Sequence, residues 1–135
     1  MASIIDVEGI GPKYKRVLKE KVGISTTEAL LKAAATPKQR KELAVETGIS
    51  PKIILEWANL ADLFRVQGVG EEYSDLLEEA GVDTVVELAK RKPENLYAAI
   101  SKVNDRKKLV RRLPGLDQVK QWVAQAKKLP RKLHY

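Results

Sequence analysis

The sequence predicts an all-α protein that is built from two copies of one helical unit. Apolar residues recur three or four positions apart, and no stretch alternates apolar and polar side chains as a half-buried strand does. Ser or Thr followed by Pro, as at Thr36-Pro37 and Ser50-Pro51, is typical of a helix start. A Gly-apolar-Gly segment also occurs twice, each time directly before an amphipathic run. We therefore expect helices joined by short turns and no sheet.

Each Gly-apolar-Gly segment predicts a tight turn that leads into a helix. The two segments are Gly9, Ile10 and Gly11 in the first copy and Gly68, Val69 and Gly70 in the second. Glycine allows such a turn, positive φ included, because it has no Cβ. Pro12 suits the first position of the next helix, whose unpaired N–H groups and positive dipole end would face outward. A helix start of this kind can hold an anion such as a phosphate.

The first copy continues as a series of short helices with recognisable boundaries. Gly23 fits a left-handed cap at the end of the first helix, and the Ser-Thr-Thr-Glu sequence at residues 25–28 fits a capping box for the second. A third helix should run from residues 36–37 to near Gly48, and a fourth should start at residues 50–51. The apolar face of this fourth helix consists of Ile53, Ile54, Trp57, Leu60, Ala61 and Phe64.

The second half repeats these signals in the same order. A cap lies at residues 83–87 and a Lys-Pro helix start at residues 92–93. Trp57 and Trp122 fall in matching helices, 122 − 57 = 65 residues apart, against 68 − 9 = 59 residues between the glycine turns. A unit of about sixty residues therefore occurs twice, with small insertions in the later half.

The domain organisation follows from this repeat. The first unit should cover residues 1–63 and the second residues 64–135, and the lack of a Gly/Ser linker between them favours one pseudo-symmetric body. A chain of 135 residues is long enough to bury a real core. We expect Trp57 and Trp122 to pack in that core where the repeats meet, and base stacking is the alternative role for these rings.

The composition limits the classes of function. With 44% hydrophobic and 32% charged residues, the chain has the balance of a globular protein. It contains no cysteine, which excludes disulfides, thiolate chemistry and Cys-based metal sites. The net charge of +7 favours an acidic partner such as nucleic acid. The N-terminus lacks the pattern of a secretory signal and no apolar run is long enough for a membrane span, so we expect a cytoplasmic protein without a membrane partner.

The charged residues that follow the two glycine turns differ in sign. They are Lys13, Lys15 and Arg16 after the first turn and Glu71, Glu72 and Asp75 after the second. Acidic side chains stabilise a helix start and would repel a phosphate that approaches it. We therefore expect the first turn to contact phosphate and the second turn to have lost this capacity.

A second basic feature lies in the C-terminal third of the chain. From residue 102 onward, eleven basic residues stand against Asp105 and Asp117, a net charge of 11 − 2 = +9. The basic residues are Lys102, Arg106, Lys107, Lys108, Arg111, Arg112, Lys120, Lys127, Lys128, Arg131 and Lys132. This uneven distribution is typical of a nucleic-acid footprint, and a solvated helix face with a basic tail is the alternative. We single out Arg111 and Arg112, which precede a Leu-Pro-Gly sequence, as the contact residues to test first.

The glycine turns and their apolar frame resemble the helix-hairpin-helix motif. In that motif, main-chain amides around the turn hold a nucleic-acid phosphate and nearby basic side chains assist. The resemblance implies a contact made by Gly9–Gly11 with Lys13, Lys15 and Arg16. Lys15 departs from the motif, which usually has a small residue at this place, whereas Ser74 follows it. Either the Lys15 side chain snorkels to the surface or the first hairpin is splayed.

The longer pattern carries a second resemblance. The paired units, their Thr-Pro and Ser-Pro helix starts and the Glu56–Leu63 segment before the second turn resemble a family of small, uncharacterised microbial proteins. These proteins consist of tandem helix-hairpin-helix units and form a domain of unknown function. The resemblance covers roughly residues 3–130, and it implies the fold but no activity.

Nothing in the sequence indicates catalysis. His134 is the sole histidine and lies beside the terminus, and adjacent acidic residues such as Glu71 and Glu72 cannot both face one point on a helix. We expect no catalytic residues, no metal site and no cofactor, and therefore no enzyme.

Two functions of different classes remain open. The first is a nucleic-acid-binding module without sequence preference, with duplex DNA favoured over RNA as its target. The second is a non-catalytic protein–protein adaptor on a degenerate helix-hairpin-helix scaffold. The acidic second turn and the nearly neutral charge of residues 1–101 favour this alternative.

Overall fold

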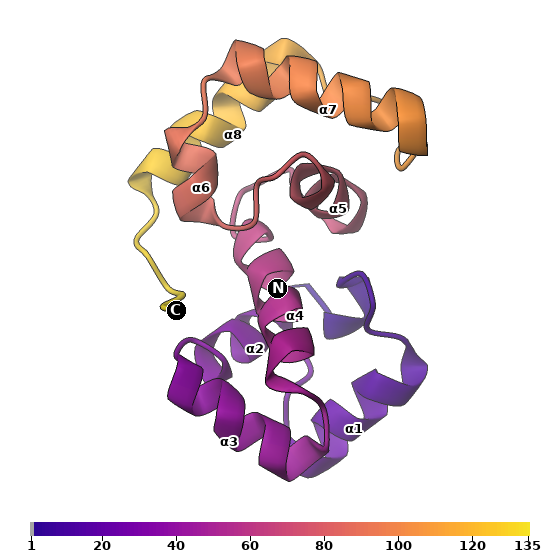
Figure 1. Ribbon diagram of the computed structural model, residues 1–135, viewed down its shortest axis with the longest axis vertical. Coiled ribbons are helices and arrows are strands. Elements are labelled where there is room, and N and C mark those ends of the chain that lie inside the picture. Colours follow the sequence, from indigo (N-terminus) through magenta and orange to yellow (C-terminus); the bar gives the residue numbers. More distant parts are fainter. Residues whose placement is uncertain (1) are drawn as a thin grey trace. The chain divides into compact units, whose positions relative to one another are not determined.

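The protein is all-α, as the sequence predicts. The computed structural model describes residues 2–135, which form eight α-helices, one short 3-10 helix and no strand (Figure 1). The elements are η1 (Ile4–Asp6), α1 (Pro12–Val22), α2 (Thr27–Ala33), α3 (Pro37–Thr47), α4 (Pro51–Leu63), α5 (Glu71–Glu79), α6 (Val85–Lys90), α7 (Pro93–Lys107) and α8 (Leu116–Lys128). No helix in this part of the chain is long and apolar enough to cross a membrane.

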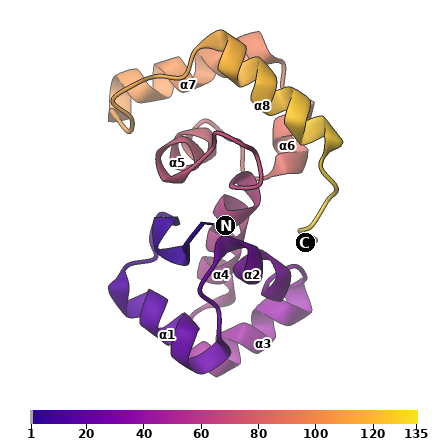
Figure 2. The ribbon, with the colours of Figure 1, turned by 180° about the vertical axis from the view of Figure 1, so that it is seen from behind.

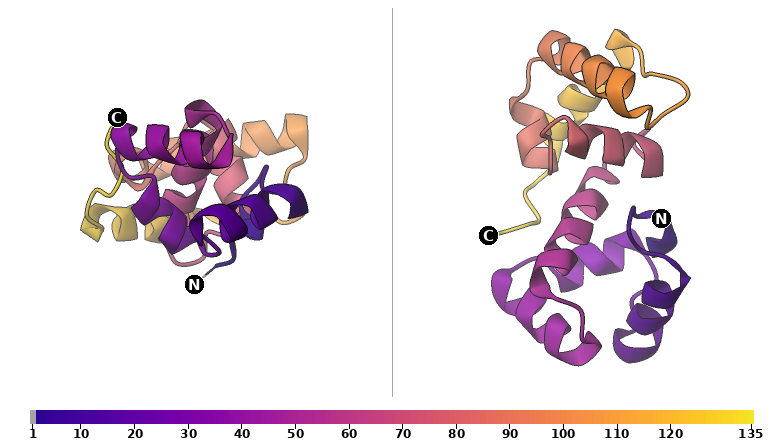
Figure 3. Two further views of the ribbon diagram at one scale, coloured as in Figure 1. Left: turned by 90° about the horizontal axis from the view of Figure 1, so that it is seen from below. Right: turned by 45° about the vertical axis from the view of Figure 1, so that its right-hand side comes forward.

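The chain divides into two compact units. The first comprises the residues up to Asp62 together with Arg131–Tyr135, and the second comprises Leu63–Pro130. In the first unit, α1 and α2 pack against α3 (Figure 3). In the second unit, α8 packs against α6 and α7, and α5 packs against α7 (Figure 2).

Each unit has its own hydrophobic core, with one tryptophan in it. Trp57 is 3% exposed in the core of the first unit, and Trp122 is 1% exposed in the core of the second. The prediction that both rings are core residues is therefore confirmed. The predicted location, one core where the repeats meet, is wrong, because each ring is buried in the separate core of its own unit. Their burial leaves no open face on which a base could stack.

Caps confirm several predicted helix boundaries. Gly23 and Gly48 have φ of 70° and 76°, and they end α1 and α3 in the left-handed conformation. Thr36 starts α3 through a full capping box, because its side chain accepts from Gln39 N and the Gln39 side chain accepts from Thr36 N. At these positions the local sequence is sufficient to predict where a helix begins or ends.

The capping box predicted at residues 25–28 is wrong by one position. Thr26, not Ser25, is the N-cap residue of α2, and its hydroxyl accepts a hydrogen bond from Ala29 N at 3.1 Å. In the second unit, Thr84 caps α6 in the same way, with Glu87 N as donor at 3.3 Å. Ser25 and Thr26 both precede Thr27, the first residue of α2, and either hydroxyl suits an N-cap, so the sequence alone does not select between them.

The C-terminal tail, Arg131–Tyr135, belongs to the first unit, whereas the sequence assigned residues 64–135 as a whole to the second. Leu133 is 2% exposed within the core of the first unit. His134 N donates to Ala35 O and His134 O accepts from Arg40 Nη2, both at 2.8 Å. Arg40 is 5% exposed, and burial lowers the pKa of its guanidinium group. Main-chain bonds hold most of the tail, and such bonds leave little signal in a sequence.

Candidate nucleic-acid interface

The two glycine turns have the same backbone geometry. Gly9 and Gly68 both have φ of 93°, in the left-handed region that favours glycine. A Cβ at Gly9 would lie 3.0 Å from Trp57 Nε1, and a Cβ at Gly68 would lie 3.3 Å from Trp122 Nε1. Both turns therefore need glycine for two reasons, the positive φ and the close approach of the indole.

The packing behind each turn is also the same. A tyrosine in the helix that follows the turn packs on the buried tryptophan. The ring pairs are Tyr14 with Trp57, 5.1 Å apart between centroids, and Tyr73 with Trp122, 5.3 Å apart. The middle residue of each turn, Ile10 or Val69, is buried. Ile10 N donates to Val7 O at 3.0 Å, so this amide is used inside the turn and is not open to a ligand.

The first open amides lie at the start of α1. Gly11 is the N-cap residue, no side chain caps the helix, and Pro12 has no N–H. Within residues 2–135, neither Lys13 N nor Tyr14 N has a hydrogen-bond acceptor, and neither Asp6 nor Glu8 caps them. A Cβ at Gly11 would meet nothing within 4 Å, so the space around this N-cap position is open.

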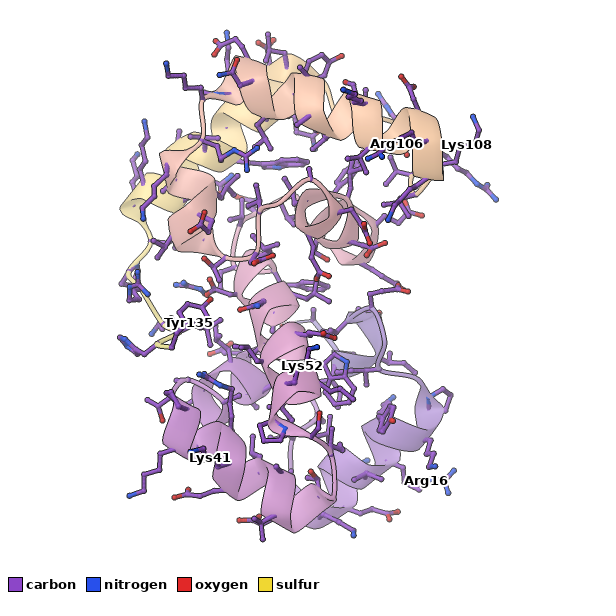
Figure 4. All side chains as sticks on the ribbon, in the orientation of Figure 1. Arg16, Lys41, Lys52, Arg106, Lys108 and Tyr135 are labelled. Carbon is purple, nitrogen blue, oxygen red and sulfur yellow. The ribbon has the colours of Figure 1, made fainter. Side chains whose placement is uncertain are left out.

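Basic side chains accompany the open amides of α1. Lys13 and Arg16 are exposed, and Arg16 projects outward from α1 (Figure 4). Lys15 is half-buried. The matching residue of α5, Ser74, is fully buried and its hydroxyl donates to Glu71 O at 3.1 Å. The structure thus brings together the predicted contact residues Gly11, Lys13 and Arg16, with Lys15 partly covered.

The start of α5 has the same shape but the opposite charge. Gly70 is its N-cap residue without a side-chain cap, and a Cβ there would also meet nothing within 4 Å. The first turn of α5 contains Glu71 and Glu72, whereas the first turn of α1 has no acidic residue. These two carboxylates already satisfy the helix dipole of α5 and oppose a phosphate.

A hydrogen-bonded brace also distinguishes the second turn from the first. Gln67 N donates to Gln125 Oε1 at 2.9 Å, and Gln125 Nε2 donates to Gln67 O at 3.3 Å. By the offsets of the two repeats, the matching residues of the first unit are Glu8 and Leu60. Leucine cannot form this pair, so the first turn lacks the brace.

The other predicted contact residues lie in a segment that we term the basic loop, Arg106–Arg112. It runs from the last residues of α7 into the connection to α8, and its basic residues are Arg106, Lys107, Lys108, Arg111 and Arg112. Asn104 fixes this segment, because its side chain donates to Val110 O at 3.2 Å and accepts from Val110 N at 3.0 Å. Val110 is buried, and Lys108 has φ of 51°. Arg106 and Lys108 project from the end of α7 (Figure 4).

The basic loop is attached to α5. The Tyr73 hydroxyl donates to Arg112 O at 2.9 Å, and Lys107 Nζ forms an ion pair with Glu79. Arg111 and Arg112 are exposed, and neither forms an ion pair within the described residues. The cations singled out from the sequence therefore lie next to the helix that follows the acidic turn.

Sequence reasoning missed the residues that shape the basic loop. Asn104 stands near a helix end, where Asn often bonds to the backbone, but its partner is chosen by the fold of the connection. Tyr73 was readable as an apolar-face aromatic residue by comparison with Tyr14, whereas the acceptor of its hydroxyl was not. In both residues the hydrogen-bond partner is set by tertiary contacts, which the sequence does not show.

Comparison with known proteins matches most of the chain to one family. Residues 8–129 match the family described as "Domain of unknown function (DUF4332)". The matched range includes both glycine turns and the basic loop. No curated protein and no solved structure matches the chain.

Proposed function

The chain belongs to the DUF4332 family, a domain of unknown function, and we propose that it is a non-catalytic nucleic-acid-binding module. It would bind the phosphate backbone without sequence preference, and duplex DNA is the proposed target. Each unit would be one helix-hairpin-helix unit with its glycine turn as the hairpin. The matching φ of Gly9 and Gly68, each against an indole, supports this assignment.

The start of α1 is the observation that carries the proposal. Two adjacent amides, those of Lys13 and Tyr14, have no acceptor among residues 2–135 and lie at the positive end of a helix dipole. Lys13 and Arg16 are exposed on the same helix, and no acidic residue stands in its first turn. Amides and cations together form a contact suited to a phosphate group.

The glycine at position 11 supports a close approach of the ligand. Its φ of −86° is open to any residue, and a Cβ would collide with nothing. Neither backbone conformation nor close packing therefore requires glycine here, in contrast to Gly9. A missing side chain does favour the approach of a phosphate to the amides behind it.

The chemistry of the contact favours binding without base recognition. Lys13, Lys15 and Arg16 lie on the first turns of the helix that carries the open amides, and such groups neutralise phosphates wherever they occur along a strand. Phosphate contacts position a protein but do not read sequence. The resemblance to paired hairpins, which follow a duplex backbone, favours duplex DNA over RNA.

The experiment that tests the proposal compares two charge reversals. Lys13→Glu with Arg16→Glu removes the cations of the α1 start, and Lys90→Glu with Lys92→Glu makes the same change in charge elsewhere. In fluorescence anisotropy with a labelled duplex at low salt, the first pair should lower the affinity by about tenfold or more, and the control should lower it less. Equal losses in both, or no binding by the unaltered chain, would contradict the proposal. Tighter binding to RNA or single-stranded DNA than to the duplex would contradict the choice of target.

The acidic start of α5 favours a second candidate, a protein–protein adaptor. Glu71 and Glu72 are exposed beside a turn that Gln125 braces, which suits a basic protein segment better than a nucleic acid. A defined protein partner should then remain bound after nuclease treatment and be lost when both glutamates are replaced by lysine. Loss of the partner on nuclease treatment would rule this candidate out.

A further inference from the structure

We propose that in the second unit the basic loop, Arg106–Arg112, makes the phosphate contact that the acidic glycine turn of that unit cannot make. Asn104 and Tyr73 hold the loop in its binding conformation. The inference rests on the proposed function, and the ligand is again the phosphate backbone of duplex DNA. The two units would thus contact phosphates in different ways, the first through a helix start and the second through a folded loop.

The basic loop lies where the second unit departs from the first. In the first unit, α3 has 11 residues, and a connection of three residues (48–50) joins it to α4. The corresponding helix α7 has 15 residues, and the connection to α8 has eight (108–115). All five cations of the basic loop lie at the end of this longer helix or in the longer connection. The first unit packs its matching helices without the longer helix and connection. Packing alone therefore does not account for these extra residues in the second unit.

The added segment is held in one conformation. The two hydrogen bonds of Asn104 clamp the main chain of Val110 across the helix end, and the Val110 side chain is buried. Lys108 takes the left-handed conformation that closes α7, as Gly48 does at the end of α3. Pro114 is buried just before α8 begins. A loop that is already ordered loses less conformational entropy when it binds, so its cations contribute more to affinity.

A tyrosine joins the loop to the helix that follows the acidic turn. The Tyr73 hydroxyl donates to Arg112 O, and its ring stays packed on Trp122. Tyr14 has the same ring packing in the first unit, but its hydroxyl forms no hydrogen bond within residues 2–135. Tyrosine at this position thus forms a hydrogen bond to the main chain only in the unit that contains the basic loop.

Four of the five basic side chains of the loop are exposed and lack an ion-pair partner within residues 2–135. Lys107 pairs with Glu79, whereas Arg106, Lys108, Arg111 and Arg112 are exposed and form no ion pair in the part of the chain that the structure describes. Adjacent arginines on a fixed main chain suit phosphate, because the guanidinium group can donate two parallel hydrogen bonds to it. The repulsion between Glu71, Glu72 and a phosphate directs the ligand to the loop.

The test separates the shape of the loop from its charge. Asn104→Ala and Tyr73→Phe leave the net charge unchanged, and Asn95→Ala and Tyr97→Phe are matched controls in α7. In duplex-binding titrations across a salt series, the two test variants of the full chain should bind about three- to tenfold more weakly, with the salt slope unchanged. The controls should bind as the unaltered chain does. Arg111→Gln with Arg112→Gln should make the log–log slope shallower by about 1.8.

The outcomes distinguish this inference from the proposed function. If the unaltered chain binds the duplex but Asn104→Ala and Tyr73→Phe keep its affinity, the loop is not a preorganised contact and the inference fails. An unchanged slope in the double arginine variant would overturn it as well, while the contact at α1 would stand. No binding by the unaltered chain would remove the proposed function itself. Tyr73→Phe retains the ring against Trp122, so this variant reports on the loop even if Asn104→Ala proves unstable.

Discussion

The four glycines of the two turns are of two kinds. Gly9 and Gly68 lie at φ of 93° with an indole nitrogen close by, so the fold requires glycine there. Gly11 and Gly70 have φ of −86° and −117° with open space around the position of a Cβ. The first pair shapes the turn, and the second pair provides the N-cap residues of α1 and α5 without the need for a positive φ.

Replacement of Gly9 by alanine should destabilise the first unit. The new side chain would sit at a positive φ and 3.0 Å from Trp57 Nε1. Strain of this kind costs about 1–3 kcal/mol in the free energy of unfolding, as measured by urea denaturation. Gly68→Ala should act in the same way on the second unit. A variant as stable as the unaltered chain would show that the turn differs from the one described here.

Replacement of Gly11 by alanine should give the opposite pattern. Alanine is a poorer N-cap residue than glycine, so the free energy of unfolding should fall by less than about 1 kcal/mol. The methyl group would stand beside the open amides of Lys13 and Tyr14 and weaken duplex binding. A binding constant equal to that of the unaltered chain would contradict the role of these amides.

The sequence predicted the role of residues that act on their near neighbours in the chain, and it did not predict the residues that form contacts between distant segments. The glycine spacing identified both turns, and the spacing of apolar residues identified the buried tryptophans. The pairs Gln67–Gln125 and Asn104–Val110 were not predicted. A polar side chain has many possible backbone partners, and only the folded chain selects one of them.

At the scale of helices, α1 and α5 are the same element with opposite charge at the start. Both begin at a glycine that provides no side-chain cap, after a turn of the same geometry. Lys13, Lys15 and Arg16 follow in α1, whereas Glu71 and Glu72 follow in α5. The sequence alone predicted this contrast, because position within the first turn determines how a charge interacts with the helix dipole.

Neutralisation of the two glutamates should partly restore the anion site of α5. Glu71→Gln with Glu72→Gln removes the repulsion of phosphate and should raise the affinity for duplex DNA. The same change should lower the stability of the second unit by about 0.3–1 kcal/mol per carboxylate lost from the helix start. Duplex titrations and urea denaturation measure the two effects. Weaker binding in this variant would show that the carboxylates themselves take part in recognition.

At the scale of the whole molecule, the path of the chain was the feature least accessible from the sequence. The apolar pattern yielded the repeat and the buried tryptophans. It predicted one core in one body, whereas each unit has a core of its own, and it assigned the C-terminal tail, Arg131–Tyr135, to the second unit. The tail lies on the first unit through one leucine, the main chain of His134 and a hydrogen bond from the Tyr135 hydroxyl to Asn59 Oδ1 at 3.0 Å. A basic segment with a single buried side chain shows no repeating pattern of apolar residues, so its position in the fold cannot be predicted from the sequence.

Truncation of Leu133 should loosen the tail and weaken the first unit. Leu133→Ala removes a side chain that is buried in the core, at a cost of about 2–4 kcal/mol in the free energy of unfolding. Trypsin should then cleave faster after Arg131 and Lys132. His134→Ala is the matched control, because His134 contacts the unit through its main chain and its side chain is exposed. Equal stability and cleavage rates in the two variants would contradict the docked tail.

The salt dependence of duplex binding tests the central claim most directly. If the α1 start and the basic loop together neutralise about four phosphates, the logarithm of the binding constant should fall against the logarithm of salt concentration with a slope of about −3.6. This slope should appear with duplexes of unrelated sequence, because the contacts are with the backbone. A slope near zero, or no binding at low salt, would contradict the account.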